Sequence, residues 1–282
     1  MSCAVAALSL VVLLAGATPA AEPVRVATLL PYVEDALVRL DPRTVVVVAT
    51  ARRELHAPPP APVIDLGNPH SPSFERLAEA HADLIVGDRM MHAALADRLG
   101  AHGEVLLVDS STVDATLDGL EEVGRRVGAG PAMARAVGET RAGLAAQALA
   151  TPVPTLLLFG TPGSFMVVSK RTWVGDLAEQ VKLRNLGDQV SGSERFPGFV
   201  QASDEVLAGL RPELILLIAH GDPTAIRAAF DQKLDAGPLA PLRASASRGV
   251  HVLPGAQFAT NPGLRLSDAA AELRELATSG EP

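Results

Sequence analysis

Short apolar strands alternate with amphipathic helices along most of this 282-residue chain. RTVVVVA (43–49) is a β-branched apolar run typical of a buried parallel strand, and ADLIVG (82–87) is another. The helix SPSFERLAEA (71–80) lies between them, with Ser71 or Ser73 as its N-cap. A second series of the same kind begins with TLLLFG (155–160). The alternation predicts an α/β fold of two lobes, each with a mostly parallel central sheet.

The segment between the two series is helical almost throughout. PAMARAVGETRAGLAAQALA (131–150) is rich in strong helix formers and predicts a single long helix that joins the lobes. The expected organisation is a signal peptide at 1–21, an N-terminal α/β lobe at 22–128, a connecting helix at 129–151 and a C-terminal α/β lobe at 152–282.

An internal repeat supports two related lobes. SFERLAEAHADLIVG (73–87) aligns without gaps on SDEVLAGLRPELILL (203–217). Any helix followed by a strand gives some similarity of this kind, but one fixed offset with no gap favours duplicated lobes.

The N-terminal segment predicts export. An apolar run from Ala4 to Ala17 is followed by small residues and proline, as in a secretory signal peptide, although no basic residue precedes it and a retained anchor stays open. LLAGA resembles a lipoprotein box whose cysteine would be Ala17, and Cys3 lies upstream. We therefore expect a soluble, extracytoplasmic monomer without a lipid anchor, whose metal chemistry would use His, Met, Tyr or carboxylates.

Charge and motifs exclude several functions. The formal net charge is −8 and no basic cluster occurs, which argues against nucleic-acid binding. The chain contains no GxSxG, HExxH or Walker motif, and GTPGS (160–164) lacks a following lysine. We therefore expect a protein that is not an enzyme.

Three segments carry a resemblance to a known family: GNPHSPSFERLA (67–78), LLFGTPGSFMVVSKRTWVGDL (157–177) and LIAHGDPTAI (217–226). On these segments the chain resembles the helix-linked solute-binding proteins of ABC importers for iron-siderophores, cobalamin and heme. It is most similar to the heme receptors of the iron-regulated surface-determinant system of Gram-positive bacteria. The resemblance implies a periplasmic-binding-protein type of fold, heme as the ligand and delivery to an ABC permease.

Two histidines are the predicted iron ligands. His70 and His220 each follow an apolar strand, and ligands of α/β lobes bind at the carboxyl ends of strands. Alone, each reads as a loop residue hydrogen-bonded to the backbone; together, they could bind heme iron from its two faces. The resemblance implies a histidine at position 220 and a methionine at position 70, so His70 is a departure from that pattern. Tyr32 is the rival ligand, or a partner for a propionate.

A heme pocket also needs apolar walls and a few cations. Met90 and Met91 follow a strand, but helix packing is the favoured interpretation for both. Phe196 and Phe199 lie in a further Gly/Pro-rich loop. The predicted lining residues are Phe165, Met166, Trp173 and Phe258, and the predicted propionate partners are Arg52, Lys170 and Arg171, with Arg53 as a further candidate.

The resemblance gives Glu75 and Glu205 a separate role. It implies that one acid at the top of each lobe docks on arginines of the permease. A carboxylate in the first turn of a helix also suits the helix dipole, which is the structural alternative.

Other functions stay open at this stage. The ligand could be a ferric siderophore or a corrinoid, although the single tyrosine of the chain does not favour a siderophore. An enzyme could hold zinc with His70, His220 and Asp222. A heme scavenger would need no permease.

Overall fold

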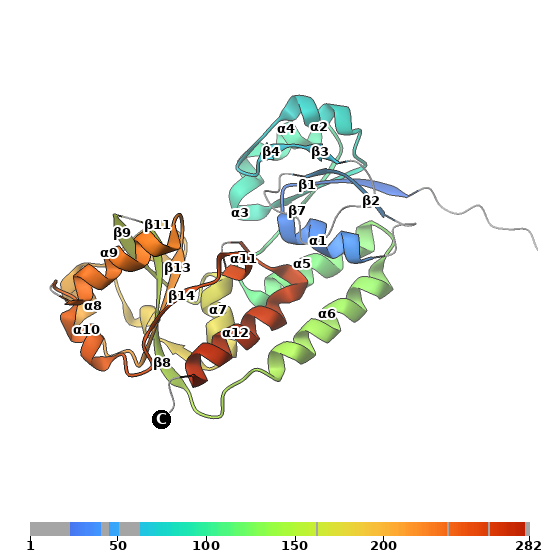
Figure 1. Ribbon diagram of the computed structural model, residues 1–282. Coiled ribbons are helices and arrows are strands. Elements are labelled where there is room, and N and C mark those ends of the chain that lie inside the picture. Colours follow the sequence, from blue (N-terminus) through green and yellow to red (C-terminus); the bar gives the residue numbers. More distant parts are fainter. Residues whose placement is uncertain are drawn as a thin grey trace, which may run out of the picture.

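The computed structural model describes residues 23–40, 45–50, 63–161, 163–235, 237–258 and 260–279. It has an α/β fold of two lobes, each built on a central sheet (Figure 1). The fold class predicted from the alternation of strands and helices is confirmed. The predicted signal peptide at 1–21, Arg52 and Arg53 lie outside the described residues.

The described N-terminal lobe is built on five parallel strands in the order β3-β2-β1-β6-β7. One side of the sheet packs on Leu77 of α2 and Leu99 of α4, and the other on Val33 of α1 and Leu117 of α5. Pro31 begins α1, because its missing N–H would have no partner inside the helix there. The elements are β1 (Val24–Thr28), α1 (Pro31–Arg39), β2 (Val45–Thr50), β3 (Ile64–Asp65), β4 (Gly67–Asn68), β5 (Ser71–Pro72), α2 (Phe74–Ala80), β6 (Leu84–Asp88), α3 (Arg89–His92), η1 (Ala93–Leu95), α4 (Ala96–Gly100), β7 (Glu104–Val108) and α5 (Val113–Arg126).

The C-terminal lobe contains a mixed sheet in the order β11-β12-β9-β8-β13-β14, with β10 beside the start of β8. β8, β13 and β14 are parallel, whereas β9, β12 and β11 form consecutive antiparallel pairs that the sequence pattern did not predict. Gly198, with φ of +83°, makes the turn between β11 and β12. The elements are β8 (Val153–Thr161), β9 (Ser164–Val168), α7 (Trp173–Gln180), β10 (Leu183–Asn185), η2 (Leu186–Gln189), β11 (Ser193–Phe196), β12 (Phe199–Gln201), α8 (Asp204–Ala208), β13 (Leu214–Ala219), α9 (Pro223–Asp235), α10 (Ala240–Ser245) and β14 (Val250–Leu253).

The internal repeat forms the same unit in both lobes. Ser73 and Ser203 each cap a helix, accepting a hydrogen bond from the backbone N–H three residues later. Leu77 and Leu207 are buried at the same place in the repeat. After each helix, the chain enters a strand that runs parallel to the first strand of its lobe, β1 or β8.

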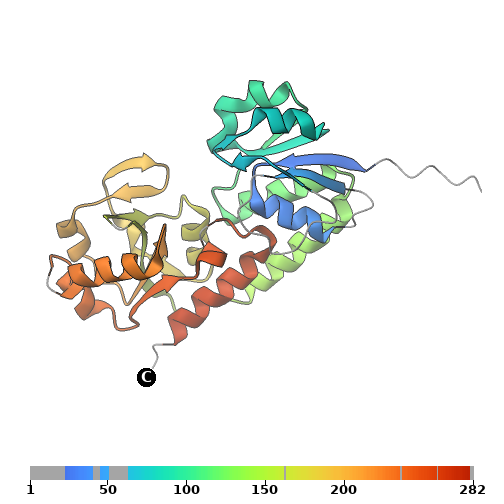
Figure 2. The ribbon, with the colours of Figure 1, turned by 45° about the horizontal axis from the view of Figure 1, so that its top comes forward.

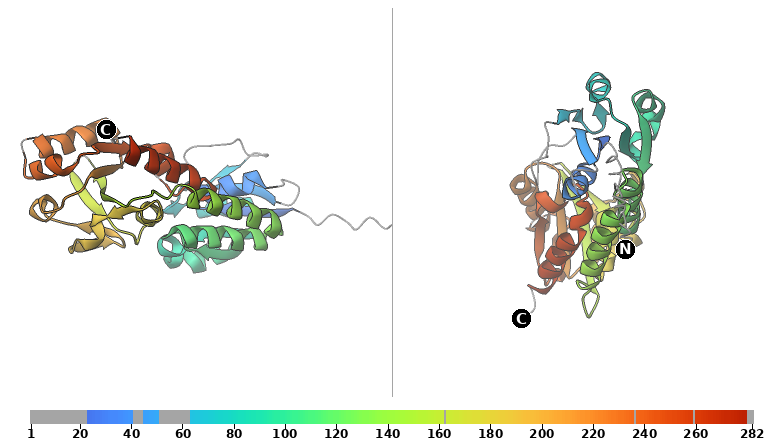
Figure 3. Two further views of the ribbon diagram at one scale, coloured as in Figure 1. Left: turned by 90° about the horizontal axis from the view of Figure 1, so that it is seen from below. Right: turned by 90° about the vertical axis from the view of Figure 1, so that its right-hand side faces the viewer.

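Helices join the lobes through one continuous core. α6 (Gly130–Ala145) packs against α5 and against α12 (Leu266–Thr278), the C-terminal helix, and the three lie side by side in Figures 2 and 3. The short α11 (Gly255–Phe258) and η3 (Gly263–Arg265) precede α12. α6 ends earlier than the predicted Ala150, because the N–H of Leu149 bonds to the carbonyl oxygen of Val181 at 3.0 Å instead of continuing the helix.

Polar contacts add to this junction. The N–H of Val113 donates to Oδ2 of Asp176 at 2.9 Å. Asn261 Nδ2 donates to the Thr116 hydroxyl at 2.7 Å.

Within the described part of the chain, no helix has both the length and the apolar character needed to cross a membrane.

Candidate functional site

Asp88 organises the carboxyl edge of the N-terminal sheet. It ends β6, and its side chain is only 2% exposed. Oδ1 accepts hydrogen bonds from the N–H groups of Met90 and Met91, at 2.8 and 2.9 Å, so Asp88 caps α3. Oδ2 accepts from the hydroxyl of Ser110, which follows β7. One buried carboxylate therefore connects α3 to the end of the neighbouring strand.

His92, the last residue of α3, holds the turn that carries His70. Its ring is fully buried; Nδ1 lies 2.8 Å from the N–H nitrogen of Asp88, and Nε2 lies 2.8 Å from the carbonyl oxygen of Pro69. Because a backbone N–H only donates, Nδ1 is the acceptor and Nε2 carries the proton that is donated to Pro69. His70 itself is exposed, and its N–H donates to Oδ1 of Asn68 at 2.9 Å.

Met90 and Met91 do not pack inside the lobe. Met90 is 61% exposed and Met91 is 38% exposed, so the interpretation as helix packing is wrong. Both stand at the start of α3, on the same helix as His92. In Figure 1, α3 and β4 lie on the side of the N-terminal lobe nearest the C-terminal lobe. The structure therefore adds two exposed thioether side chains to the neighbourhood of His70.

Tyr32 is enclosed rather than presented to solvent. It is 4% exposed, and Gly263 (φ +57°) packs so close that an added Cβ would lie 2.9 Å from Tyr32 Cβ. Burial raises the pKa of Tyr32; the Asp88 carboxylate also raises it, the Ser110 hydroxyl lowers it, and the Asp109 carboxylate raises it further. A phenolate ligand for iron needs the opposite shift, so this environment favours the neutral phenol.

His220 stands at the matching edge of the C-terminal sheet, directly after β13. Its N–H donates to the carbonyl oxygen of Gly160 at 2.9 Å, which continues the pairing of β13 with β8. Its exposed imidazole stacks on Phe159, with ring centroids 5.4 Å apart and planes at 29°. Asp222, the third zinc ligand of the enzyme alternative, accepts a hydrogen bond from the N–H of Thr224 at the start of α9.

Two aromatic rings lie on one side of His220. Phe159 meets Phe199 edge to face, with centroids 5.3 Å apart, and pairs with Met166 across β8 and β9. Trp173 and Phe258 stack nearly parallel, at 14° and 6.2 Å between centroids, but Phe258 is only 3% exposed and belongs to the core. Phe159 escaped the sequence analysis, since it reads as one more apolar residue of a buried strand.

Phe165 lies on the other side of the same sheet. It is 9% exposed and packs on Phe230 of α9, with ring centroids 5.0 Å apart. Adjacent residues of a strand point to opposite sides, so Phe165 and Met166 cannot line one pocket. The structure brings Met166 to the side of Phe159 and keeps Phe165 in the core beneath α9.

The two described cations predicted for propionates differ in their partners. Nη1 of Arg171 lies 2.8 Å from both carboxylate oxygens of Glu194, so its charge is already matched. Lys170 is exposed, and its backbone N–H donates to Oδ1 of Asp188 at 2.9 Å.

Glu75 and Glu205 occupy equivalent, exposed positions. Each lies in the first turn of its helix, α2 or α8, two residues after the capping serine. A hydrogen bond from the Ser203 hydroxyl lowers the pKa of Glu205, which keeps this carboxylate charged at neutral pH.

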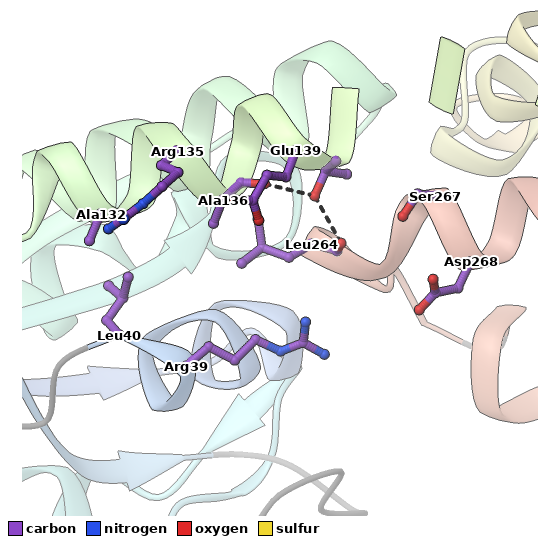
Figure 4. Close-up of a pocket in the computed structure, with 10 residues that line it drawn as sticks. Arg39, Leu40, Ala132, Arg135, Ala136, Glu139, Leu264, Ser267 and Asp268 are labelled. Atoms are coloured by element: carbon purple, nitrogen blue, oxygen red, sulfur yellow. Dashed lines mark hydrogen bonds between the residues drawn. The ribbon is translucent and has the colours of Figure 1, made fainter. Parts of the chain in front are cut away.

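A separate pocket of about 530 Å³ lies between α1, α6 and the start of α12 (Figure 4). Its charged residues are two arginines and two acids, with no aromatic side chain to cover a flat apolar ligand. None of the residues predicted for iron, propionates or docking belongs to it. Its lining is Arg39, Leu40, Ala132, Arg135, Ala136, Glu139, Thr140, Leu264, Ser267 and Asp268.

Across the described residues, no group of three or more His, Cys, Asp or Glu side chains is arranged to hold a metal ion. The candidate site consists of one exposed histidine at the carboxyl edge of each sheet. Methionines lie near the histidine of the N-terminal lobe, and aromatic rings lie near the histidine of the C-terminal lobe.

Comparison with known proteins gives a family match over most of the chain. A family model described as "Periplasmic binding protein" matches residues 26–255. The high-affinity heme uptake system protein IsdE of Staphylococcus aureus (strain Newman) is 28% identical over 78 residues, which is 28% of this chain and 25% of that protein. The aligned stretch thus spans about a quarter of this curated relative.

Solved structures share the fold over nearly the whole chain. The structure of S. aureus IsdE complexed with heme has a TM-score of 0.72 at 16% identity, covering 90% of this chain and 98% of that one. An ABC transporter substrate-binding protein from Listeria monocytogenes EGD-e gives 0.75 at 19% identity, covering 90% and 98%. The petrobactin-binding protein YclQ from Bacillus subtilis gives 0.73 at 14% identity, covering 91% and 92%. At these identities the likeness shows the fold alone.

Proposed function

This chain belongs to the periplasmic binding protein family, and we propose that it is a substrate-binding protein of an ABC importer whose substrate is heme. The observation that carries the proposal is the pair of exposed imidazoles, His70 and His220, one at the carboxyl edge of each sheet. A neutral imidazole nitrogen is a common axial ligand of heme iron. In this proposal, His70 binds the iron from the N-terminal lobe and His220 from the C-terminal lobe.

The apolar side chains at these edges suit the rest of the ligand. A porphyrin has two wide apolar faces, and each Å² of such surface removed from water contributes about 25 cal/mol. Phe159 and Phe199 stand beside His220, and Met166 lies on the same side of the sheet. Trp173, which is only partly buried, would extend this wall, and Phe258 would support it from the core. Met90 would cover the ligand from the other lobe.

Polar groups would orient the propionates. Lys170 has no ion pair among the described residues, whereas Arg171 would have to exchange Glu194 for a propionate. Arg52 stays a predicted partner outside the described residues. Tyr32 would support the wall as a neutral phenol, since its environment disfavours the phenolate.

Delivery would use the two exposed acids of the repeat. We propose that Glu75 and Glu205 bind arginines of the permease, because each projects from the first turn of an equivalent helix. The protein would be exported and would act as a monomer outside the cytoplasm.

Titration with hemin tests the proposal. The wild-type protein should give a sharp Soret band with one hemin per chain, and His70→Ala and His220→Ala should each shift and weaken it, because each removes one axial ligand. His81→Asn is the matched control: His81 is exposed, lies before β6 at the opposite edge of the sheet, and has φ of 46°, which asparagine tolerates. The control should titrate as the wild type.

Two results would contradict the heme assignment. Either the wild type shows no Soret change while a ferric siderophore or a corrinoid quenches the fluorescence of Trp173, or both alanine variants bind hemin as tightly as the wild type. The first result would leave the transport role and change the ligand.

A further inference from the structure

His92 is a buried residue that the proposed ligand set does not use. We propose that it positions the His70 imidazole by fixing the backbone of the β4–β5 turn, without touching the ligand. The inference deepens the proposed function, on which its hemin arm rests.

Two hydrogen bonds fix the ring of His92 from opposite sides. Nδ1 accepts from the N–H of Asp88 and Nε2 donates to the carbonyl oxygen of Pro69, each at 2.8 Å. The ring is 0% exposed. Gly87 leaves the space that the ring needs, since an added Cβ there would lie 3.1 Å from Nδ1 and 3.3 Å from the Cβ of His92. A ring bonded at both nitrogens and packed this closely cannot turn freely.

The peptide unit between Pro69 and His70 is held at both ends. Its carbonyl oxygen, from Pro69, accepts the bond from His92, while its N–H, from His70, donates to Oδ1 of Asn68 at 2.9 Å. A peptide unit is planar, so fixing its oxygen and its N–H fixes the plane and the direction in which the Cα of His70 leaves it. His70 is exposed, so its side chain is less constrained by packing than a buried one.

The effect of such positioning on metal affinity has a typical size. Groups that orient a metal ligand typically change metal affinity by about 10–100-fold when they are removed. Here the orienting bond acts through the peptide unit rather than on the imidazole, and it starts from α3, which Asp88 anchors to β6.

Two substitutions separate the bonds of His92. His92→Gln keeps a side-chain N–H near the position of Nε2 and can still donate to Pro69. His92→Asn keeps an acceptor near the position of Nδ1 for the N–H of Asp88, but its side chain is too short to reach Pro69. We expect His92→Asn to weaken hemin binding by about 10-fold or more and to move the Soret band toward that of His70→Ala, and His92→Gln to restore both.

Hydrogen exchange in the ligand-free protein makes the inference independent of hemin. The amide of His70 should exchange at least about tenfold faster in His92→Asn than in the wild type, with the Gln variant close to the wild type. The amides of Leu84–Gly87 in β6 should keep their rates, which shows that the lobe is folded; the amide of Asp88 is left out because it donates to His92 itself. Asn68→Ala gives a second route, because Asn68 is exposed and its loss frees the other end of the same peptide unit; it should loosen His70 in the same direction.

The results of these experiments distinguish failure of the heme proposal from failure of the positioning role. If the wild type binds no hemin but the amide of His70 is loosened in His92→Asn and Asn68→Ala, the proposed ligand fails and the positioning role stands. If His70→Ala changes the Soret band while His92→Asn keeps both the wild-type band and the wild-type exchange rate, the positioning role is refuted. Should His92→Asn not fold, an Asn68→Ala variant with the wild-type Soret band and hemin affinity refutes it, because freeing the same peptide unit then leaves the His70 imidazole in place.

Discussion

Replacement of Asp88 by alanine should lower the free energy of unfolding by a large amount for a single substitution. The buried carboxylate caps α3 through the N–H groups of Met90 and Met91, and loss of such a cap costs about 1 kcal/mol. It also accepts the hydroxyl of Ser110, and a hydrogen bond to a charged group contributes about 1.5–3 kcal/mol. The two effects give an expected loss of about 3 kcal/mol in the free energy of unfolding.

Calorimetry can measure this loss. For a chain of this size, 1 kcal/mol corresponds to about 2–4 °C, so Asp88→Ala should lower the Tm by about 6–12 °C. Asp88→Asn should lose about 1 kcal/mol less than Asp88→Ala, because asparagine caps a helix as well as aspartate does. Asp97→Ala is the control, since Asp97 is exposed on α4 and its loss should change stability by no more than about 0.5 kcal/mol.

Either of two results would contradict this role of Asp88. An Asp88→Ala variant within about 2 °C of the wild type would mean that the cap and the Ser110 bond contribute little together. An Asp88→Asn variant as unstable as Asp88→Ala would mean that the negative charge, rather than the capping oxygen, is what the site needs.

Three further predictions concern single side chains. Tyr32 is the only tyrosine of the chain, so the rise in absorbance near 295 nm on phenolate formation reports this residue alone. Because its pKa is raised, no phenolate should form near pH 10 in the folded protein. The free energy of unfolding should fall as the pH rises from there, because the phenol of the unfolded chain ionises first. Phenolate formation at pH 10 with the lobe still folded would contradict this. Ser203→Ala should raise the pKa of Glu205 in a carbon-13 NMR titration, because the hydroxyl no longer donates to the carboxylate, and an unchanged pKa would remove that cause. Met90→Ala should leave the Tm within about 1–2 °C, because Met90 is 61% exposed, while weakening hemin binding severalfold; equal affinity would exclude it from the ligand wall.

Much of the fold follows from local sequence signals. Pro31 begins α1, Ser73 and Ser203 cap α2 and α8, and the leucine of each repeat is buried where the helical period puts it. These features depend on neighbours within a few residues, and they can therefore be inferred from the chain alone.

Features that depend on distant partners escaped the analysis. His92 is recognisable only through its bond to Pro69, 23 residues away, and its sequence context is an ordinary helix. The hairpin around Gly198 pairs with β9, and neither strand has a strong period of its own. Phe165 is different, because the alternation of a strand already separates it from Met166 and could have assigned it to the core.

The central claim is that one imidazole from each lobe binds the iron of a single heme. A crystal structure of the protein with hemin tests it most directly. A ring nitrogen of His70 and a ring nitrogen of His220 should both lie at bonding distance from the iron, on opposite faces of the porphyrin. A heme whose iron is bound by neither histidine would contradict it.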